Sequence, residues 1–107
     1  MPIIDVNSEK FKNLIDNLKK DDYIIIDVRT PMEYNSGHIS GAINIDYYSS
    51  DIFSQIKSLD RNKTYLIYCR SGHRSAEISK IMEEEGFKQI YNLKNGLLDW
   101  PYNLDKR

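Results

Sequence analysis

The sequence lacks the features that mark secreted, membrane and nucleic-acid-binding proteins. Its single cysteine, Cys69, excludes an intrachain disulfide and, with no secretory signal visible near Met1, indicates a reducing cytoplasm. The densest apolar run, Tyr23-Ile24-Ile25-Ile26, is far shorter than the ~20 residues that cross a bilayer. Fifteen basic and sixteen acidic residues give a net charge of −1, without the positive excess that neutralises phosphates. We therefore expect a cytoplasmic protein that binds neither nucleic acid nor membrane.

What the sequence does contain suits one globular domain. Its 107 residues match the usual size of a single domain, and a hydrophobic content of 40% is too high for a disordered chain. No repeat, linker or low-complexity segment divides it. We therefore expect residues 1–107 to form a single domain.

Strand-like and helix-like patterns alternate along the chain. Apolar, β-branched stretches predict strands at 3–6, 23–28, 42–45, 64–68 and 88–93. Helical spacing predicts helices from 8 to about 19, 30–36, about 50–58 and about 74–85, with a short closing turn at 96–100. Because strands alternate with helices, the connections should be right-handed crossovers and the sheet mostly parallel. The predicted fold class is α/β.

Capping signals predict where the first two helices begin and end. Ser8 is the expected N-cap of the first helix, which should end near Lys19-Lys20, where basic side chains suit the helix dipole. Thr30-Pro31-Met32-Glu33 combines a capping box with proline at the first helical position, and Gly37 should end the helix that it starts. In the helix near 50–58, one side should carry Ile52, Phe53 and Ile56.

The segment after the fourth predicted strand carries the strongest chemical signal. Cys69 stands at the carboxyl end of that strand, where ligands of open α/β sheets bind, and is followed by Arg70-Ser71-Gly72-His73-Arg74-Ser75 and a helix. The helix N-terminus, the two arginines and a glycine that lets the loop curl with its N–H groups inward each lower the pKa of a thiol. The thiolate is the nucleophile, so the pattern favours a catalytic Cys69 over a buried structural cysteine.

Three stretches of the sequence resemble the rhodanese (sulfurtransferase) family. Tyr68-Cys69-Arg70-Ser71-Gly72-His73-Arg74-Ser75 is similar to the family's active-site loop. Asp27-Val28-Arg29, Glu33-Tyr34 and Gly37-His38-Ile39-Ser40-Gly41-Ala42 form a second motif, and Asn95-Gly96-Leu97-Leu98-Asp99-Trp100 matches the closing segment without its second glycine. The resemblance covers about residues 3–101. It implies a rhodanese-like three-layer α/β/α fold whose five-stranded, mostly parallel sheet has the order 3-2-4-5-1.

The resemblance also implies a sulfurtransferase without a metal or other cofactor. The Cys69 thiolate would attack the outer sulfur of a small anionic donor such as thiosulfate, releasing sulfite and leaving a persulfide on Cys69. A thiol, cyanide or a sulfur-accepting protein would then take the sulfur. The loop would bind the donor through its amides, hydroxyls and positive charge, and the residues concerned are Arg70, Ser71, Gly72, His73, Arg74 and Ser75.

Several nearby residues are expected to be structural. Asp27 and Arg29, at the end of a central strand, should support the loop as a buried ion pair rather than take part in the chemistry. His38 should be a hydrogen-bonded structural histidine. His38, His73 and Cys69 lack the short ligand spacing of a zinc site, so no metal is predicted.

Two alternative functions remain open. Cysteine phosphatases and arsenate reductases also place a thiolate and an arginine around an anion loop, but Cys69 and Arg74 have the spacing Cys-x4-Arg rather than Cys-x5-Arg. The shorter loop suits a sulfur-sized group and is too tight for a phosphoryl group. The other alternative is a non-catalytic rhodanese-like binding module or a sulfur carrier. The presence of Cys69 with both arginines favours catalysis, and an assay with thiosulfate and cyanide distinguishes the two.

Overall fold

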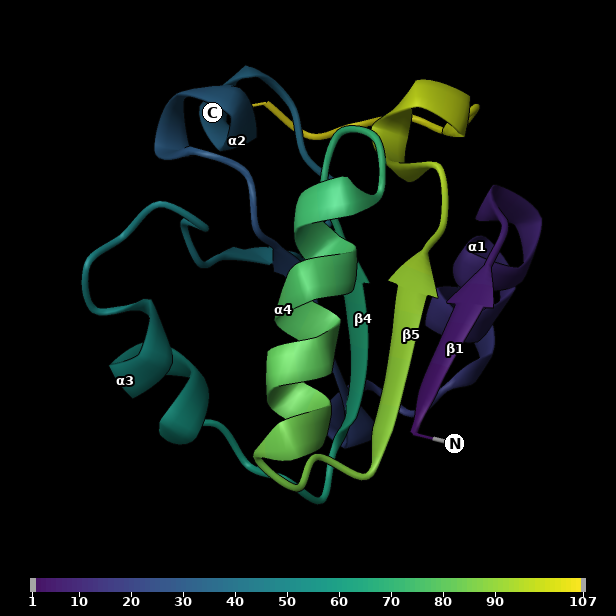
Figure 1. The fold of residues 1–107 in the computed structure, drawn as a ribbon. Coiled ribbons are helices and arrows are strands. Elements are labelled where there is room, and N and C mark those ends of the chain that lie inside the picture. The colour runs from purple at the N-terminus through teal and green to yellow at the C-terminus, as the bar shows by residue number, and fades with distance from the viewer. Residues whose placement is uncertain (1, 107) are drawn as a thin grey trace.

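The computed structural model describes residues 2–106, whose strands form one parallel sheet (Figure 1). Neighbouring strands follow the order β1-β5-β4-β2-β3, and every neighbouring pair is parallel. This is the predicted order 3-2-4-5-1 read from the opposite edge, so the α/β class and the strand order are confirmed. The strands are β1 (Ile3–Val6), β2 (Tyr23–Asp27), β3 (Ile43–Asn44), β4 (Thr64–Tyr68) and β5 (Gln89–Leu93).

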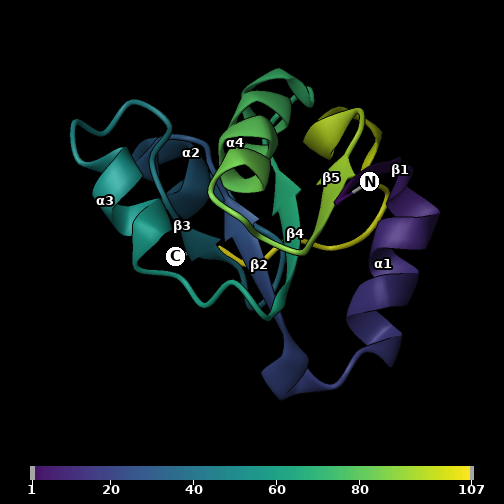
Figure 2. The same cartoon turned by 60° about the horizontal axis from the view of Figure 1, so that its bottom comes forward.

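Helices cover both faces of this sheet, which makes the three layers that the resemblance implied (Figure 2). The helix α1 lies on one face, and α3 and α4 lie on the other. Within residues 2–106, no helix has the length and apolarity needed to cross a membrane. The helices are α1 (Ser8–Asn17), α2 (Pro31–Ser36), α3 (Ile52–Lys57) and α4 (His73–Glu84), and the short 3₁₀ turns are η1 (Lys20–Asp22) and η2 (Gly96–Asp99).

The central strands supply two hydrophobic cores at once. Successive side chains of a strand point to opposite faces, so Ile67 of β4 packs with α4 while Leu66 packs in the cluster on the α1 face. Ile26 and Ile25 of β2 divide between the same two clusters. The nearly continuous apolarity of these strands therefore reflects burial on both faces.

The predicted N-cap of the first helix is wrong by one residue. Asn7 is the N-cap, and its Oδ1 accepts a hydrogen bond from the Lys10 amide at 2.9 Å. The Ser8 hydroxyl instead donates to the carbonyl of Asp99 at 3.1 Å. This partner is 91 positions away along the chain, so the local sequence could not reveal it.

Other element ends also differ from their predictions. The first helix ends at Asn17, because Leu18 is already extended with a ψ of 149°, and Lys20 belongs to η1 rather than to the last turn of α1. The third strand and the third helix are shorter than the predicted ranges 42–45 and 50–58. In α3, Phe53 is 56% exposed rather than packed beside Ile52 and Ile56, since those two face inward at i, i+4 and the next position turns away.

Candidate active site

Cys69 follows β4 at the carboxyl edge of the sheet, and the Cys69 loop, residues 69–75, comprises the connection after β4 and the first residues of α4 (Figure 1). The residue is buried, with 1% of its surface exposed. Because β2 and β5 flank β4 and run parallel to it, the segments that follow those two strands meet this loop from both sides. The carboxyl edge of the sheet therefore assembles the site from three separate parts of the chain.

Hydrogen-bond donors surround the sulfur of Cys69. The Gly72 amide donates to Sγ at 3.1 Å and the Ser75 amide at 3.4 Å, while the Ser75 hydroxyl oxygen lies 3.4 Å from Sγ. Burial raises the pKa of the Cys69 thiol, but the hydrogen bonds from Ser75 and from the amides of Ser71 and Gly72 outweigh it and lower the pKa overall. This arrangement stabilises a thiolate, which is the nucleophilic form of cysteine.

Gly72 lets the loop turn sharply beneath the sulfur. Its φ of +97° lies in the left-handed region, which residues with a side chain rarely adopt. A Cβ atom at this position would lie only 1.8 Å from the carbonyl oxygen of Lys94, just after β5. Both the backbone angle and the close approach therefore require glycine.

The turn η2 holds the loop through backbone contacts. The Leu97 amide donates to the carbonyl of Cys69 and the Leu98 amide to the carbonyl of Arg70, both at 3.1 Å. These carbonyls point toward η2, so the amides on the other side of the same peptide planes point away from it. A Cβ on Gly96 would lie 2.4 Å from the Arg70 oxygen, so this close approach also depends on glycine.

Helix α2 holds the loop from the other side through a side-chain ion pair. Both terminal nitrogens of Arg74 donate to the carboxylate of Glu33, at 2.9 and 3.1 Å. Glu33 also completes the predicted capping box: its carboxylate accepts from the Thr30 amide at 3.1 Å, while the Thr30 hydroxyl accepts from the Glu33 amide at 3.2 Å. The hydrogen bonds from Arg74 are the main reason that the pKa of Glu33 is lowered to about 2.

The remaining loop side chains lie at the surface. Arg70, Ser71 and His73 are exposed, and the His73 Nε2 is 3.6 Å from a carboxylate oxygen of Glu77. Of the residues predicted to bind the donor, the structure therefore brings Gly72 and Ser75 to the sulfur and ties Arg74 to α2. The side chains of Arg70, Ser71 and His73 stay at the surface, away from these contacts with the sulfur.

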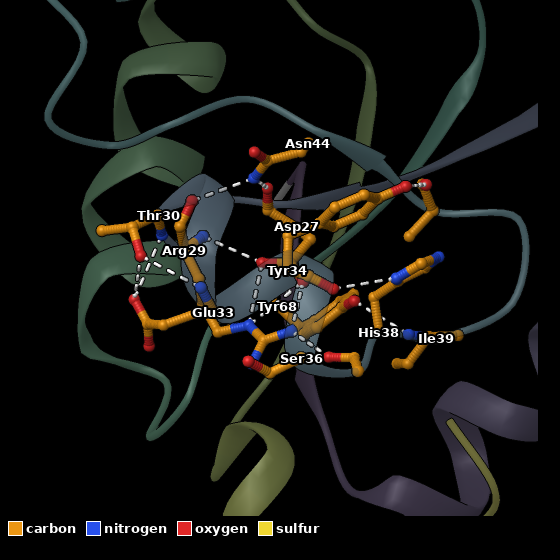
Figure 3. A network of polar contacts seen from close by, with 12 residues as sticks. Asp27, Arg29, Thr30, Glu33, Tyr34, Ser36, His38, Ile39, Asn44 and Tyr68 are labelled. Carbon is orange, nitrogen blue, oxygen red and sulfur yellow. Dashed lines mark hydrogen bonds and ion pairs between the residues drawn. The ribbon is translucent and has the colours of Figure 1, made fainter. Parts of the chain in front are cut away.

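A buried ion pair between Asp27 and Arg29 lies at the end of β2, next to Tyr68 (Figure 3). The Arg29 Nη2 is 2.7 Å from the Asp27 carboxylate and also donates to the carbonyl of Gly37 at 2.6 Å. The guanidinium carbon of Arg29 is 5.8 Å from the centre of the ring of Tyr68, the residue that precedes Cys69. Burial opposes the charge of Arg29, but the hydrogen bond to Asp27 outweighs it and raises the pKa of Arg29. The pair thus connects β2, the end of α2 and the start of the loop.

His38 has structural contacts in the turn after α2 (Figure 3). Its ring stacks on Tyr34 with centroids 3.9 Å apart, and its Nδ1 lies 3.0 Å from the Tyr34 carbonyl. Its backbone exchanges two hydrogen bonds of 2.8 Å with Asp105. Among residues 2–106, no cluster of three or more His, Cys, Asp or Glu side chains could hold a metal ion.

Two supports of the loop were not predicted from the sequence. The pattern around Glu33 predicts only its capping box, whereas its pairing with Arg74 joins residues 41 positions apart. The contacts of Gly96, Leu97 and Leu98 were also missed. A signal for them was available, since the Asn95-Gly96 turn follows the strand next to β4 and so must lie at the same edge as Cys69.

The comparisons with known proteins agree on one family. The profile of the rhodanese-like domain family matches residues 8–102. The chain is 33% identical over 100 residues to the putative sulfurtransferase YtwF of Bacillus subtilis (strain 168), covering 94% of this chain and 92% of the relative. It is 32% identical to the thiosulfate sulfurtransferase GlpE of Coxiella burnetii, covering 78% and 76%. The crystal structure of a rhodanese-like domain protein from Staphylococcus aureus matches with a TM-score of 0.82 at 29% identity, over 100% of this chain and 99% of that one.

The chain spans only part of two other curated relatives. It covers 51% of the putative sulfur carrier protein YrkF of Bacillus subtilis (strain 168) at 32% identity. It covers 33% of the tRNA uridine(34) hydroxylase of Pelagibacter ubique (strain HTCC1062) at 30% identity. The matches take in 92% and 95% of this chain, so a similar segment occurs inside longer proteins.

Proposed function

Because the chain belongs to the rhodanese-like domain family, we propose that it is a sulfurtransferase in which Cys69 carries the transferred sulfur as a persulfide. The observation that carries the proposal is the contact of Sγ with the amides of Gly72 and Ser75. Amides that face one point stabilise a negative charge there, whether it is the thiolate or a terminal persulfide sulfur. The names of the relatives YtwF and GlpE support the reaction class, and that of GlpE supports thiosulfate as a donor.

The first half-reaction forms the persulfide. The Cys69 thiolate attacks the outer sulfur of thiosulfate, so a sulfur–sulfur bond forms to Cys69 while the bond inside the donor breaks. Sulfite leaves with the electron pair of the broken bond, and the total charge is unchanged. The donated hydrogen bonds that lower the pKa of Cys69 increase the thiolate fraction available for this attack.

The second half-reaction returns the enzyme to its starting state. A nucleophile such as cyanide attacks the outer sulfur of the persulfide, which gives thiocyanate and restores the Cys69 thiolate. We propose that the acceptor in the cell is a thiol or a sulfur-accepting protein and that the protein works in the cytoplasm, where a lone cysteine stays reduced. The two steps share one covalent intermediate, so ping-pong kinetics are expected.

A sulfur-carrier role is the second candidate, because a relative matching over 92% of this chain is named a putative sulfur carrier protein. The chemistry of the first step is the same, and the difference is whether the persulfide passes to a small molecule or to another protein. Phosphatase activity is not expected, since the Cys69-to-Arg74 loop keeps the short Cys-x4-Arg spacing.

The proposal is tested by mass spectrometry and kinetics on the wild type and on Cys69→Ser. After incubation with thiosulfate, the wild-type protein should gain the mass of one sulfur atom, and cyanide should remove it as thiocyanate. The serine variant should show neither change, because the chain has no other thiol. A wild-type protein that gains no sulfur and forms no thiocyanate would contradict the proposal. Sulfur gain that cyanide cannot reverse, but that a protein thiol can, would favour the carrier role.

A further inference from the structure

A groove of about 360 Å³ adjoins the loop on the side of Arg70. One wall is apolar, formed by Leu97 and by Leu98, which is 63% exposed. Thiosulfate is a compact ion without an apolar part, so it would use little of this wall. The groove suits a larger donor that joins a charged sulfur group to an apolar group. Its lining residues are Arg29, Glu33, Ser36, Arg70, Leu97 and Leu98.

The charges around this groove are largely cancelled by ion pairs. Arg29 is paired with Asp27, and Glu33 is paired with Arg74, which itself lies outside the groove lining. Arg70 forms no ion pair with any residue in the described range 2–106. The groove therefore presents one uncompensated positive charge, and thiosulfate carries two negative charges at neutral pH.

We propose that Glu33 determines donor specificity: it neutralises Arg74, leaves Arg70 as the cation that meets the donor, and so favours organic sulfane-sulfur donors with one negative charge. The inference rests on the proposed function and deepens it by naming the donor class. Glu33 acts as a positioning and charge-setting residue, since it contacts Arg74 rather than the sulfur.

The proposed reaction of such a donor is balanced. With benzenethiosulfonate as the probe, the Cys69 thiolate attacks the terminal sulfur and forms the Cys69 persulfide. The sulfur–sulfur bond of the probe breaks, and benzenesulfinate leaves with its electron pair. The phenyl ring would lie against Leu97 and Leu98, while Arg70 would pair with the anionic end.

The first test compares the two donors on the wild-type protein, with cyanide as the acceptor. We expect kcat/KM for benzenethiosulfonate to exceed that for thiosulfate at least ~10-fold, the effect of a modest apolar contact together with a matched charge. An equal or higher value for thiosulfate would overturn the specificity proposal. Absence of turnover with both donors would reject the proposed function instead, so the two failures differ.

A second test removes the apolar wall. Leu98→Ser should lower the ratio of kcat/KM for benzenethiosulfonate to kcat/KM for thiosulfate roughly 5-fold. The backbone amide that holds the Arg70 carbonyl stays in place in this variant. Met32→Ser is the matched control, because Met32 is 80% exposed on α2 but does not line the groove. Equal effects of the two variants would contradict a role of the wall.

A third test removes the negative charge of Glu33 but keeps the capping box at the N-terminus of α2. Glutamine also serves at the third position of a capping box, so Glu33→Gln should keep α2 intact while leaving Arg74 positive. The preference for benzenethiosulfonate over thiosulfate should fall roughly 5-fold. The midpoint pH for alkylation of Cys69 by iodoacetamide should also move downward, because the unneutralised arginine favours the thiolate. A variant with unchanged preference and unchanged midpoint would overturn the role of Glu33.

Discussion

The Cys69 loop is held on two sides by different kinds of contact. On the η2 side, the Leu97 and Leu98 amides bind loop carbonyls, and glycine permits the close approach. On the α2 side, Arg74 and Glu33 form an ion pair whose side chains are 17% and 31% exposed. Backbone contacts on the first side are independent of pH and salt, whereas an ion pair at a partly exposed site responds to both.

The two sides of the Cys69 loop have different roles. The η2 side fixes the arrangement of the Gly72 and Ser75 amides around Sγ, called the amide cradle below. A change there should alter both the stability of the fold and the reactivity of Cys69. The α2 side sets the charge near the loop, and beside it the buried Asp27–Arg29 pair holds the end of α2 in place. Substitutions on each side should therefore have effects of different size and kind.

The largest effect is expected at Gly72 on the η2 side. In Gly72→Ala, the new Cβ would meet the Lys94 carbonyl and the backbone would be strained at its φ of +97°, so we expect a loss of about 4 kcal/mol of stability. Gly86→Ala is the matched control, since its φ of +89° is similar but nothing lies within 4 Å of the added Cβ. It should lose only about 1–2 kcal/mol. Urea unfolding measures both, and equal losses would contradict the contact with Lys94.

The next effect concerns the buried pair under α2. Asp27→Asn leaves the buried Arg29 guanidinium without its counter-charge, so the free energy of unfolding should fall by about 3 kcal/mol. The surface pair Lys12–Asp16 supplies the control, because its side chains are 37% and 53% exposed. Asp16→Asn should change the stability by less than about 1 kcal/mol. If the two variants unfold at the same urea concentration, the Asp27–Arg29 pair does not hold this side of the loop.

A smaller effect separates the cap of α2 from its ion pair. Glu33→Ala removes the pair with Arg74 and the carboxylate that accepts from the Thr30 amide, while the Glu33 amide can still donate to the Thr30 hydroxyl. The stability should fall by about 1–2 kcal/mol. Glu33→Gln keeps the capping box and should lose about half as much. Neither variant should abolish the amide cradle, which the η2 side supports. A large fall in the rate at which iodoacetamide alkylates Cys69 in both variants would show instead that the amide cradle depends on α2.

The smallest effect is a pH dependence of the α2 side. Hydrogen bonds from Arg74 lower the pKa of Glu33 to about 2 in the folded protein, below its ordinary value of 4.5. A carboxyl whose pKa is lowered on folding stabilises the fold above the ordinary pKa and loses this contribution as the pH falls toward the folded value. The wild type should therefore exceed Glu33→Gln in stability by about 1 kcal/mol at pH 6, a margin limited by solvent screening. Unfolding in urea at pH 6, 4.5, 3 and 2 should show the margin shrinking below pH 4.5; a constant margin would contradict the assignment.

Features that depend on near neighbours were predictable from the sequence. The strand at 64–68 was predicted with its observed ends, and the capping box of Thr30 and Glu33 forms as predicted, because each depends on residues within one turn or strand. The position of Cys69 at the carboxyl edge followed from the alternation of strands and helices. The N-cap at residue 8 failed because a distant carbonyl, that of Asp99, binds the Ser8 hydroxyl.

The sequence by itself determined the strand–loop–helix segment of this site. This segment is a buried strand with a cysteine at its end, a glycine that turns the chain, and a helix whose first turn lies beside the sulfur. Only the tertiary structure decided which charges remain uncompensated around it. Arg70 and Arg74 look equivalent in the sequence, yet strand order brings Glu33 of α2 to Arg74 across 41 positions and leaves Arg70 on the groove. The physical reason is that a backbone angle is set by adjacent residues, whereas the partner of a long side chain depends on how distant segments pack.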